Sequence, residues 1–525
     1  ADRGVDLHQN PGQAGQGVSM EKTVQIYYTS DTHGHIFPVN YAANCPEKTG
    51  LLNLADQMEK DGNTLVLDGG DSLQGTPLTQ YYLENRGRWP VHPVAAAFNA
   101  MGLDYFTLGN HDFNFGYEAL RDYLRAMDGV CLCANVEDLG GELPICPWTV
   151  HTLANGLRVG ITGVVTDFVN VWEQPQNLER LRITDAFQAA LTACSALRDQ
   201  CDVRVCIYHG GFEEELETGR VLSDSGENIA CKIARELDFD LLLTGHQHMA
   251  VEGVELSGTY AVQPPANAGQ FLRITGQQDG RNFCFHSKLT PVGATHGTEP
   301  YQSLLPLEQA VQVWLDQPIG ELAYPISPEG KLDAALYGSQ VAALFNQVQL
   351  AETGADFSCT SLGNDPVGLA SPVTMRGVTA AYLFANTLVV LEVTKEVLRQ
   401  TLERCAAYFT LVDGQPQISE EFLLPKVEHY NYDFYAGLAY TFDLRRPVGS
   451  RVVRLTKLDG SPLGNGKFRL CTSNYRATGT GGYGILRACP VLWRGGVEMP
   501  DLTARYIQTH SPVPQLHNAE MRVIW

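Results

Sequence analysis

The sequence predicts two domains, a layered α/β domain in the first half and an α+β domain in the second. In the first half, short apolar runs rich in β-branched residues alternate with helical patterns, which is typical of a sheet covered by helices. In the second half, helical patterns come first and strand-like runs follow. A stretch rich in proline separates the halves. The length of 525 residues is sufficient for two large hydrophobic cores.

The apolar runs of the first half share a feature, because a polar residue that could hold a metal ion follows each of them. Strands are predicted at Val24–Tyr28, Thr64–Leu67, Tyr105–Leu108, Val203–Tyr208 and Phe239–Leu243. Helices are expected between them, at Leu51–Lys60, Tyr117–Met127 and Asp185–Arg198. Ligands of α/β sheets gather at the carboxyl ends of the strands, so we expect these polar residues to meet there.

The same patterns predict the domain boundaries. Residues 1–20 are interpreted as a disordered leader, 21–290 as the first domain, 291–325 as a connector with a helix at Leu307–Leu315, and 326–525 as the second domain. In the second domain we expect helices at Ala334–Leu350 and Lys395–Tyr408, and strands at Gly437–Leu444, Arg451–Leu458 and Lys467–Thr472.

Charge and composition exclude some classes of partner. A formal net charge of −22 argues against polymeric nucleic acid, although a metal ion could still attract a small anion by reversing the local field. No apolar run approaches the roughly 18 residues that a membrane span requires. The 13 cysteines are interpreted as free, mostly buried thiols, which favours the cytoplasm, with export after removal of a signal as the alternative. We expect a monomer.

Five short motifs offer ligands for metal ions. They are Asp31-Thr32-His33, Gly69-Gly70-Asp71, Gly109-Asn110-His111-Asp112, His209 and Gly245-His246-Gln247-His248. Carboxylate and amide oxygens mixed with imidazoles suit Mn²⁺, Zn²⁺, Co²⁺ or iron rather than calcium. Asp71, in the middle of the set, is the candidate to bridge two ions. Two neighbouring ions can hold a hydroxide between them and polarise a phosphoryl oxygen.

Each motif has an ordinary structural explanation when it stands alone, such as a capped turn or a hydrogen-bonded buried histidine. All five occur in order, each after its own predicted strand. Burying these carboxylates and imidazoles without a cation would be costly, because the acids would lack partners. The set as a whole therefore favours a metal site.

The motifs resemble the blocks D-x-H, G-D, G-N-H-[DE], H and G-H-x-H of the metallophosphoesterase (calcineurin-like) superfamily, over about Thr23–Pro291. The resemblance implies a layered α/β-β-α catalytic domain with two divalent metal ions. One ion would be held by Asp31, His33, Asp71 and His248, and the other by Asp71, Asn110, His209 and His246. His111 would contact the phosphoryl group and stabilise charge on the leaving oxygen.

The second half resembles the C-terminal domain of the 5′-nucleotidase family. The matching stretches are Val373–Arg376, Ala385–Leu391, Gly437–Val453 and Ser473–Ala477. In that family this domain binds the nucleoside and stacks its base between two aromatic rings. The resemblance implies that Asn386, Tyr432 and Tyr483 bind substrate. Ordinary packing is the alternative for either tyrosine.

Two departures from the 5′-nucleotidase pattern favour one branch of the family. The run from Asn110 to Asn114 ends in an amide, where 5′-nucleotidases commonly have an Asp that supports the catalytic histidine. Asn114 is therefore expected to act with His111 and to tune its protonation differently. The stretch Ser358–Asp365 lacks the arginine of an N-G-G-x-R-like loop. Both departures, and the run His429–Asp433, resemble the 2′,3′-cyclic-nucleotide 2′-phosphodiesterase/3′-nucleotidases.

The resemblance thus implies a metal-dependent phosphodiesterase and phosphomonoesterase acting on small nucleotides. It would convert nucleoside 2′,3′-cyclic phosphates and 3′-nucleotides to nucleosides and phosphate by attack of a hydroxide held between the metal ions. Two alternatives are a 5′-nucleotidase or UDP-sugar hydrolase, and a catalytically silent protein that binds nucleotides with the help of metals.

Overall fold

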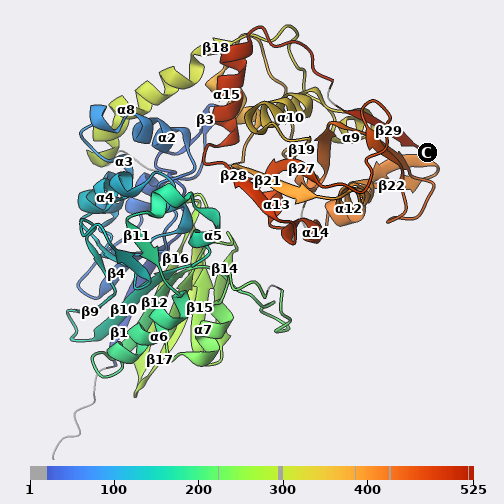
Figure 1. The fold of residues 1–525 in the computed structure, drawn as a ribbon. Helices are drawn as coiled ribbons and strands as arrows, with labels where there is room; N and C mark the ends of the chain where they lie inside the picture. Colours follow the sequence, from blue (N-terminus) through green and yellow to red (C-terminus); the bar gives the residue numbers. More distant parts are fainter. Residues whose placement is uncertain (1–20, 223, 294–298, 385, 425–426, 518) are drawn as a thin grey trace, which may run out of the picture.

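The computed structural model describes residues 21–525 except 223, 294–298, 385, 425–426 and 518. The predicted disordered leader, residues 1–20, therefore lies outside the described residues. Figure 1 shows an N-terminal domain, coloured blue to yellow-green, and a C-terminal domain, coloured gold to red, which lies to one side of it.

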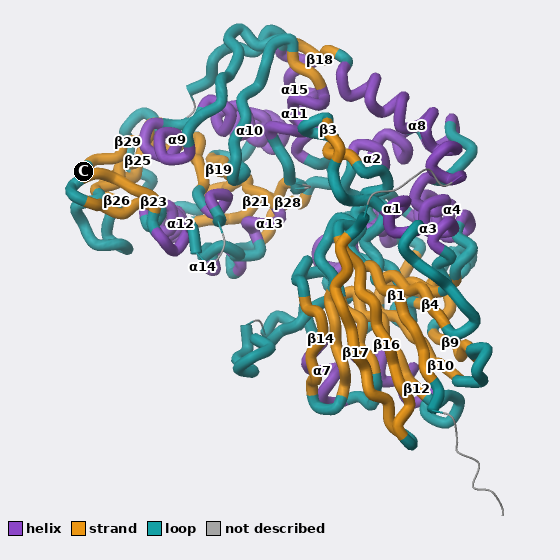
Figure 2. The backbone as a smooth tube through the Cα atoms, turned by 180° about the vertical axis from the view of Figure 1, so that it is seen from behind, coloured by secondary structure: helices purple, strands orange, loops and turns teal. Residues whose placement is uncertain are grey.

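The N-terminal domain contains two mixed sheets that pack face to face. The first has the strand order β17-β16-β1-β4-β5-β6-β8, and β1 pairs in parallel with β4 and antiparallel with β16. Its strands are β1 (Thr23–Thr29), β4 (Thr64–Asp68), β5 (Tyr105–Phe106), β6 (Val130–Leu132), β8 (Ile145–Cys146), β16 (Gln270–Asp279) and β17 (Asn282–Pro291). Several of them lie side by side in Figure 2.

The second sheet has the order β14-β15-β13-β12-β10-β9, and its central strands are parallel. Its strands are β9 (Trp148–Thr152), β10 (Arg158–Val165), β12 (Val203–His209), β13 (Leu241–Thr244), β14 (Val251–Leu256) and β15 (Thr259–Gln263). A short pair, β7 (Val136–Asp138) with β11 (Leu181–Ile183), and another, β2 (Val39–Asn40) with β3 (Cys45–Pro46), lie outside the two sheets.

Apolar side chains fill the space between the sheets, because alternate residues of each strand face inward. Ile26 and Leu65 of the first sheet share this core with Ile161, Val205 and Leu243 of the second. Helices cover the outer faces. They are α1 (Leu51–Ala55), α2 (Pro77–Glu84), α3 (Pro93–Met101) and α4 (Tyr117–Ala126) on the first sheet, and α6 (Ala186–Leu197) and α7 (Ala230–Glu236) on the second. The layered α/β-β-α prediction is confirmed.

The predicted connector contains a long helix that packs on the N-terminal domain. Helix α8 (Glu299–Asp316) includes Pro306, and its buried residues Leu307, Val311 and Leu315 join the same core as α3 and α4. The sequence predicted only its second half as helical. Strand β18 (Pro318–Gly320) follows and pairs with β20 (Val373–Thr374) of the second domain.

The C-terminal domain is an α+β unit. One sheet has the order β24-β19-β27-β21-β28 and a smaller one the order β26-β25-β29, and a hairpin joins β22 to β23. The strands are β19 (Phe357–Ser361), β21 (Leu388–Val393), β22 (Phe409–Val412), β23 (Gln415–Ile418), β24 (Asp433–Ala436), β25 (Leu438–Asp443), β26 (Val452–Lys457), β27 (Phe468–Ser473), β28 (Val491–Arg494) and β29 (Glu520–Ile524). The helices are α9 (Lys331–Tyr337), α10 (Gln340–Thr353), α11 (Met375–Ala381), α12 (Lys395–Ala406), α13 (Asn474–Ala477), α14 (Gly484–Arg487) and α15 (Met499–His510).

One helix prediction in this domain is wrong. The stretch Ala334–Leu350 was expected to be continuous, but the structure divides it into α9 and α10. Gly338 adopts a φ of 101°, which a helix does not allow, and the hydroxyl of Ser339 accepts a hydrogen bond from Ala342 N as the N-cap of α10. The apolar periodicity continues across this break, so the pattern alone did not reveal it.

Polar contacts join the two domains. Arg376 of α11 donates to Tyr41 O at 2.7 Å and to Gln312 Oε1 of α8 at 2.6 Å. Gln74 donates to Glu498 Oε1 at the start of α15, at 2.8 Å. Among the described helices none is long and apolar enough to cross a membrane. The cysteines of the described residues are free thiols, as predicted.

Candidate metal centre

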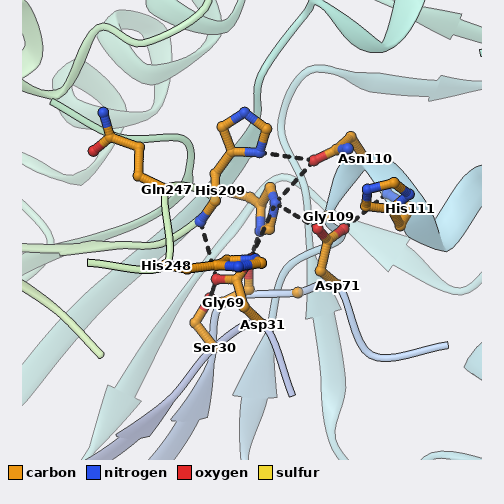
Figure 3. A network of polar contacts seen from close by, with 12 residues as sticks. Ser30, Asp31, Gly69, Asp71, Gly109, Asn110, His111, His209, Gln247 and His248 are labelled. Carbon is orange, nitrogen blue, oxygen red and sulfur yellow. Dashed lines mark hydrogen bonds and ion pairs between the residues drawn. The ribbon is translucent and has the colours of Figure 1, made fainter. Parts of the chain in front are cut away.

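The seven predicted ligands meet at one edge of the two sheets. Asp31 and His33 follow β1, Asp71 follows β4, and Asn110 begins a 3₁₀ turn after β5. His209 is the last residue of β12, and His246 and His248 follow β13. Figure 3 shows Asp31, Asp71, Asn110, His209 and His248 pointing toward one another. This convergence agrees with the rule that parallel strands present ligands at their carboxyl ends.

The ligand atoms form two compact groups. Asp31, His33 and His248 make up one, and Asp71, His209 and His246 the other, each with its ligand atoms within 4.8 Å of one another. Asp71 Oδ2 lies 3.3 Å from His209 Nε2 and 4.0 Å from His33 Nε2, so it reaches both groups. Asn110 Oδ1 lies 3.1 Å from His209 Nε2 and 3.0 Å from His246 Nδ1. The predicted bridge by Asp71 is compatible with these distances.

Strained backbone turns aim several of these side chains inward. Positive φ angles are uncommon for residues other than glycine and cost about 1–3 kcal/mol each. They occur at Asp31 (52°), His33 (46°), Asp71 (60°), His246 (74°) and His248 (57°). Because these turns follow directly after paired strands, the backbone fixes where the candidate ligand side chains begin.

Asp112 fastens two of the turns together, a role that the sequence analysis missed. Its carboxylate accepts hydrogen bonds from the backbone N–H groups of Asp71 at 2.9 Å, Ser72 at 2.8 Å, Leu73 at 3.0 Å and Gly109 at 2.8 Å. A Cβ on Gly70, whose φ is 91°, would collide with the backbone of Gly109. The two loops therefore pack closely, and the final Asp of the Gly-Asn-His-Asp motif was the signal for this contact.

Two histidines have one ring nitrogen committed to a backbone carbonyl. His33 Nδ1 lies 2.9 Å from Gln74 O and His209 Nδ1 lies 2.6 Å from Gly69 O. A carbonyl oxygen only accepts, so both Nδ1 atoms carry protons, and Nε2 is the nitrogen through which each neutral ring could bind an ion. His33 Nε2 lies 3.0 Å from His248 Nε2, an arrangement that a shared cation would stabilise.

The residues fit a pair of divalent cations. Asp31 Oδ1 is buried without a hydrogen-bond partner among the described residues. Burial alone would raise the pKa of Asp31, but the nearby imidazole of His209 and then His248 hold that pKa below its usual value. Burial would lower the pKa of His209, yet Asp71 and Asp31 raise it to about 10. The pocket is thus anionic and attracts positive charge.

His111 lies beside the centre without belonging to either group. Its backbone N–H donates to Asp71 Oδ1 at 2.8 Å, and its ring centroid is 5.9 Å from that of His33. Asn114 Nδ2 lies 3.0 Å from His111 Nδ1. An amide nitrogen only donates, so Nδ1 accepts and the proton of a neutral ring is on Nε2. The prediction that His111 and Asn114 act together is compatible with this contact.

A cleft with a volume of about 640 Å³ connects the centre to the C-terminal domain. His33, Asn110, His111, His246 and His248 line one wall, and Phe384, Asn386, Asn474 and Tyr475 line the other. Its acidic side chains are Glu173, Glu227 and Glu498, and burial raises the pKa of Glu498 to about 7. No Lys or Arg is among the described residues that line the cleft. The metal centre therefore faces the second domain across an opening that carries acidic side chains.

Both halves of the chain match known protein families in the predicted order. Residues 24–250 match the calcineurin-like phosphoesterases, and residues 326–488 match the C-terminal domain of 5′-nucleotidases. A solved structure of a candidate 5′-nucleotidase from Staphylococcus aureus, in complex with α-ketoglutarate, is 30% identical, with a TM-score of 0.79. The superposition covers 95% of this chain and 100% of that one. The chain belongs to the 5′-nucleotidase family of calcineurin-like phosphoesterases.

Curated relatives of this family member include nucleotide phosphoesterases. It is 25% identical to the 2′,3′-cyclic-nucleotide 2′-phosphodiesterase/3′-nucleotidase of Haemophilus influenzae, over 89% of this chain and 82% of the relative. It is 23% identical to the trifunctional nucleotide phosphoesterase of Bacillus subtilis, over 95% of this chain but 38% of the relative. The chain thus spans 38% of that longer protein. Membership makes it a phosphoester hydrolase, and the fold of the family implies divalent metal ions.

The structure contradicts the prediction that Tyr432 and Tyr483 of this phosphoesterase stack a substrate base. Their exposed fractions are 2% and 1%, and both belong to the core of the C-terminal domain. Tyr432 OH donates to Ala335 O at 3.0 Å, and Tyr483 OH donates to Asn431 O at 2.6 Å. Because their own domain covers them, a rotation between the domains would leave both rings buried.

A buried ion pair completes the cover over Tyr483. Arg476 binds both carboxylate oxygens of Asp433, at 2.8 and 2.9 Å, and its guanidinium lies 4.1 Å from the centroid of the Tyr483 ring. Among the described residues of the C-terminal domain, the aromatic ones that line the cleft are Phe384 and Tyr475. Tyr475 stands in the matched Ser473–Ala477 stretch, which was the signal that could have identified it.

Proposed function

We propose that this phosphoesterase hydrolyses nucleoside 2′,3′-cyclic phosphates and then 3′-nucleotides, releasing nucleoside and phosphate. The observation that carries the choice of a substrate with a single phosphate is the charge of the cleft: the candidate metal ligands are on one wall, and no Lys or Arg is among the described lining residues. The choice of the cyclic phosphate rests on Asn114, which contacts His111 where 5′-nucleotidases commonly have an Asp. A single phosphate can be neutralised by the metal ions alone. Additional phosphates would meet the carboxyl groups of Glu173, Glu227 and Glu498, and no Lys or Arg of the described lining would neutralise them.

The candidate ligands would hold Mn²⁺, Zn²⁺, Co²⁺ or iron, in the two sets that the family resemblance implies. When bound, the pair would supply an activated water and a positive charge for the phosphoryl oxygens. His111 would donate the proton on Nε2 to a phosphoryl or leaving oxygen. The Asn114 amide supports this state, because its donation to Nδ1 keeps that nitrogen without a proton.

The C-terminal wall would hold the nucleoside. Tyr475 is 36% exposed, and Phe384 and Asn386 lie beside it in the lining of the cleft. Stacking on an aromatic face stabilises a bound base by about 1–3 kcal/mol, whichever base it is. Binding of the base so far from the phosphorus would orient the reacting phosphate over the metal centre.

A second candidate function is that of a 5′-nucleotidase or nucleotide-sugar hydrolase. It is favoured by the 30% identity to the Staphylococcus aureus protein over the whole of that chain. The described residues that line the cleft include no Lys or Arg, which counts against diphosphate substrates but does not distinguish 5′-AMP from 3′-AMP.

A substrate panel separates these activities. The full chain, stripped with a chelator and then supplied with Mn²⁺, is assayed against 2′,3′-cyclic AMP, 3′-AMP, 5′-AMP and UDP-glucose. We expect the highest kcat/KM with the cyclic phosphate, lower values with 3′-AMP, and no turnover before metal is restored. A preference for 5′-AMP or UDP-glucose would reject our proposal, and no turnover with any member would favour a silent nucleotide-binding protein.

A further inference from the structure

His246 differs from His33 and His209 in the partner of its outer ring nitrogen, the one that points away from the other candidate ligands. That partner is a side chain. His33 and His209 are oriented by backbone carbonyls, as described above. His246 Nε2 instead lies 2.8 Å from Glu227 Oε1, while its Nδ1 lies 3.0 Å from Asn110 Oδ1. The partner of His246 can therefore be changed by mutation. The backbone carbonyls that orient His33 and His209 cannot.

The contact determines which nitrogen of His246 carries the proton. An ionised carboxylate only accepts, so Nε2 carries a proton. In the neutral ring the lone pair is then on Nδ1, which faces the oxygen of Asn110, and a cation shared by these two candidate ligands would accept it. Trp172 stacks on the face of the His246 ring, with ring centroids 5.4 Å apart and an interplanar angle of 25°. The tryptophan holds the plane of the imidazole, and the carboxylate holds its rotation within that plane.

We infer that Glu227 is a positioning residue for the metal centre, which acts by orienting His246 as a ligand through Nδ1. A carboxylate behind a ligating histidine fixes the ring and raises its basicity, and removing such a partner typically weakens metal binding about 10–100-fold. The inference rests on the metal pair of the proposed function, but it does not depend on which nucleotide is hydrolysed. It assigns to the acidic cleft wall a role in metal affinity.

The backbone at Glu227 is fixed independently of its side chain. Its carbonyl oxygen accepts from Thr166 Oγ1 at 2.9 Å and from Tyr208 OH at 3.2 Å. These bonds survive any substitution of the side chain, so the loop before α7 stays attached to β12. A loss of metal binding in a side-chain variant would thus report on His246 rather than on a displaced loop.

The test is a calorimetric titration of MnCl₂ into the full, chelator-stripped chain without nucleotide. Wild type is expected to bind two ions. In Glu227→Ala, we expect one ion to bind about 10–100-fold more weakly and the other to bind as in wild type. In Glu227→Gln the amide oxygen can still accept from Nε2, so we expect the loss to be less than about 10-fold.

Glu173→Gln is the matched control, since it removes a carboxylate from the same cleft. That carboxylate accepts hydrogen bonds from Gln174 N and Asn177 Nδ2, neither of which is a candidate ligand. We expect it to bind both ions as wild type does. The inference is overturned if Glu227→Ala binds both ions normally, if both ions weaken equally, or if Glu227→Gln or Glu173→Gln matches the loss in Glu227→Ala. Wild type that binds fewer than two ions would also overturn it. If the variants bind Mn²⁺ as expected but the wild type hydrolyses no nucleotide, only the proposed function is rejected and the role of Glu227 stands.

Discussion

The two walls of the cleft are built in different ways. On the metal-facing wall, buried side chains extend from strained turns at strand ends, and backbone carbonyls or Asp112 hold them in place. On the C-terminal wall, Phe384 and Tyr475 are partly exposed and stand on a loop and on the short helix α13. The first wall is preorganised for one chemistry, whereas the second can adjust to its ligand. The difference predicts that mutations on the first wall act on turnover and those on the second act on KM.

The largest effect is expected for Asp71→Ala, because Asp71 Oδ2 reaches both groups of candidate ligands. We expect kcat on 2′,3′-cyclic AMP to fall by about 10³-fold or more, since the ions supply several kcal/mol of charge stabilisation. Metal analysis should find fewer than two ions per chain. Asp459→Asn removes a carboxylate from an exposed turn of the other domain and is the control. Near-normal turnover in Asp71→Ala would show that Asp71 does not serve both groups of candidate ligands.

A smaller loss is expected for His111→Ala, which removes a proton donor but no candidate ligand. We expect kcat to fall by about 10²–10⁴-fold while the stripped protein still takes up two Mn²⁺ ions. Turnover and metal content are measured on the same preparation. If the variant loses metal along with activity, His111 belongs to the centre itself, and the assigned role is wrong.

The buried and exposed tyrosines of the second domain should respond oppositely. Tyr483→Ala removes a core ring under Arg476, and we expect it to lower the free energy of unfolding by about 3–5 kcal/mol. Tyr475→Ala should change that free energy by less than about 0.5 kcal/mol. Urea unfolding of the full chain, followed through the transition of its C-terminal domain, measures the free energy change of both variants. Equal stability of the two variants would contradict the burial of Tyr483.

Binding of substrate should depend on Tyr475 but not on the buried ring. We expect Tyr475→Ala to raise KM by a factor equivalent to about 1–3 kcal/mol, with kcat changed less, because stacking is lost in ground state and transition state alike. Tyr475→Phe keeps the aromatic face and should retain most of the affinity. An unchanged KM in the alanine variant would remove Tyr475 from the proposed nucleoside wall.

The smallest effect concerns His92, a buried histidine outside the cleft that accepts from Ala95 N as the N-cap of α3. Burial lowers its pKa to about 3, below the value near 6.5 of an unfolded chain. Below pH 6.5 the unfolded chain therefore binds a proton that the fold excludes, and stability decreases as pH falls towards 3. We expect the free energy of unfolding to drop by about 1 kcal/mol from pH 6.5 to pH 5.5.

The control for this loss is His92→Asn, which keeps an N-cap acceptor but does not titrate. Urea unfolding at pH 5.5, 6.5 and 7.5 should give a smaller dependence on pH for the variant than for wild type, with equal turnover at pH 7.5. An identical pH dependence in both proteins would show that His92 is not the source. Reduced turnover in the variant would mean that this buried histidine also serves the site.

The metal ligands were predictable because their chemistry restricts where they can lie. Asp31 and His209 are fully buried, and a buried carboxylate or imidazole needs a partner. Five polar motifs at five predicted strand ends could therefore all be buried if they met at one metal site. Tyrosine has no such restriction, since its ring packs equally well in a core or on a cleft wall. The motif spacing placed Tyr432 and Tyr483 in the right region, but the burial of each ring depended on contacts with Ala335, Asn431 and Arg476.

The sequence by itself determined the layered fold of the first domain, the α+β class of the second and the set of residues that could bind metal. Periodicity and motif order are local properties of the chain, so they are readable without coordinates. Only the tertiary structure decided that α9 and α10 are separate, that Asp112 joins two turns and that Phe384 and Tyr475 line the cleft. These depend on contacts between segments distant in sequence, which side-chain burial and backbone geometry select together.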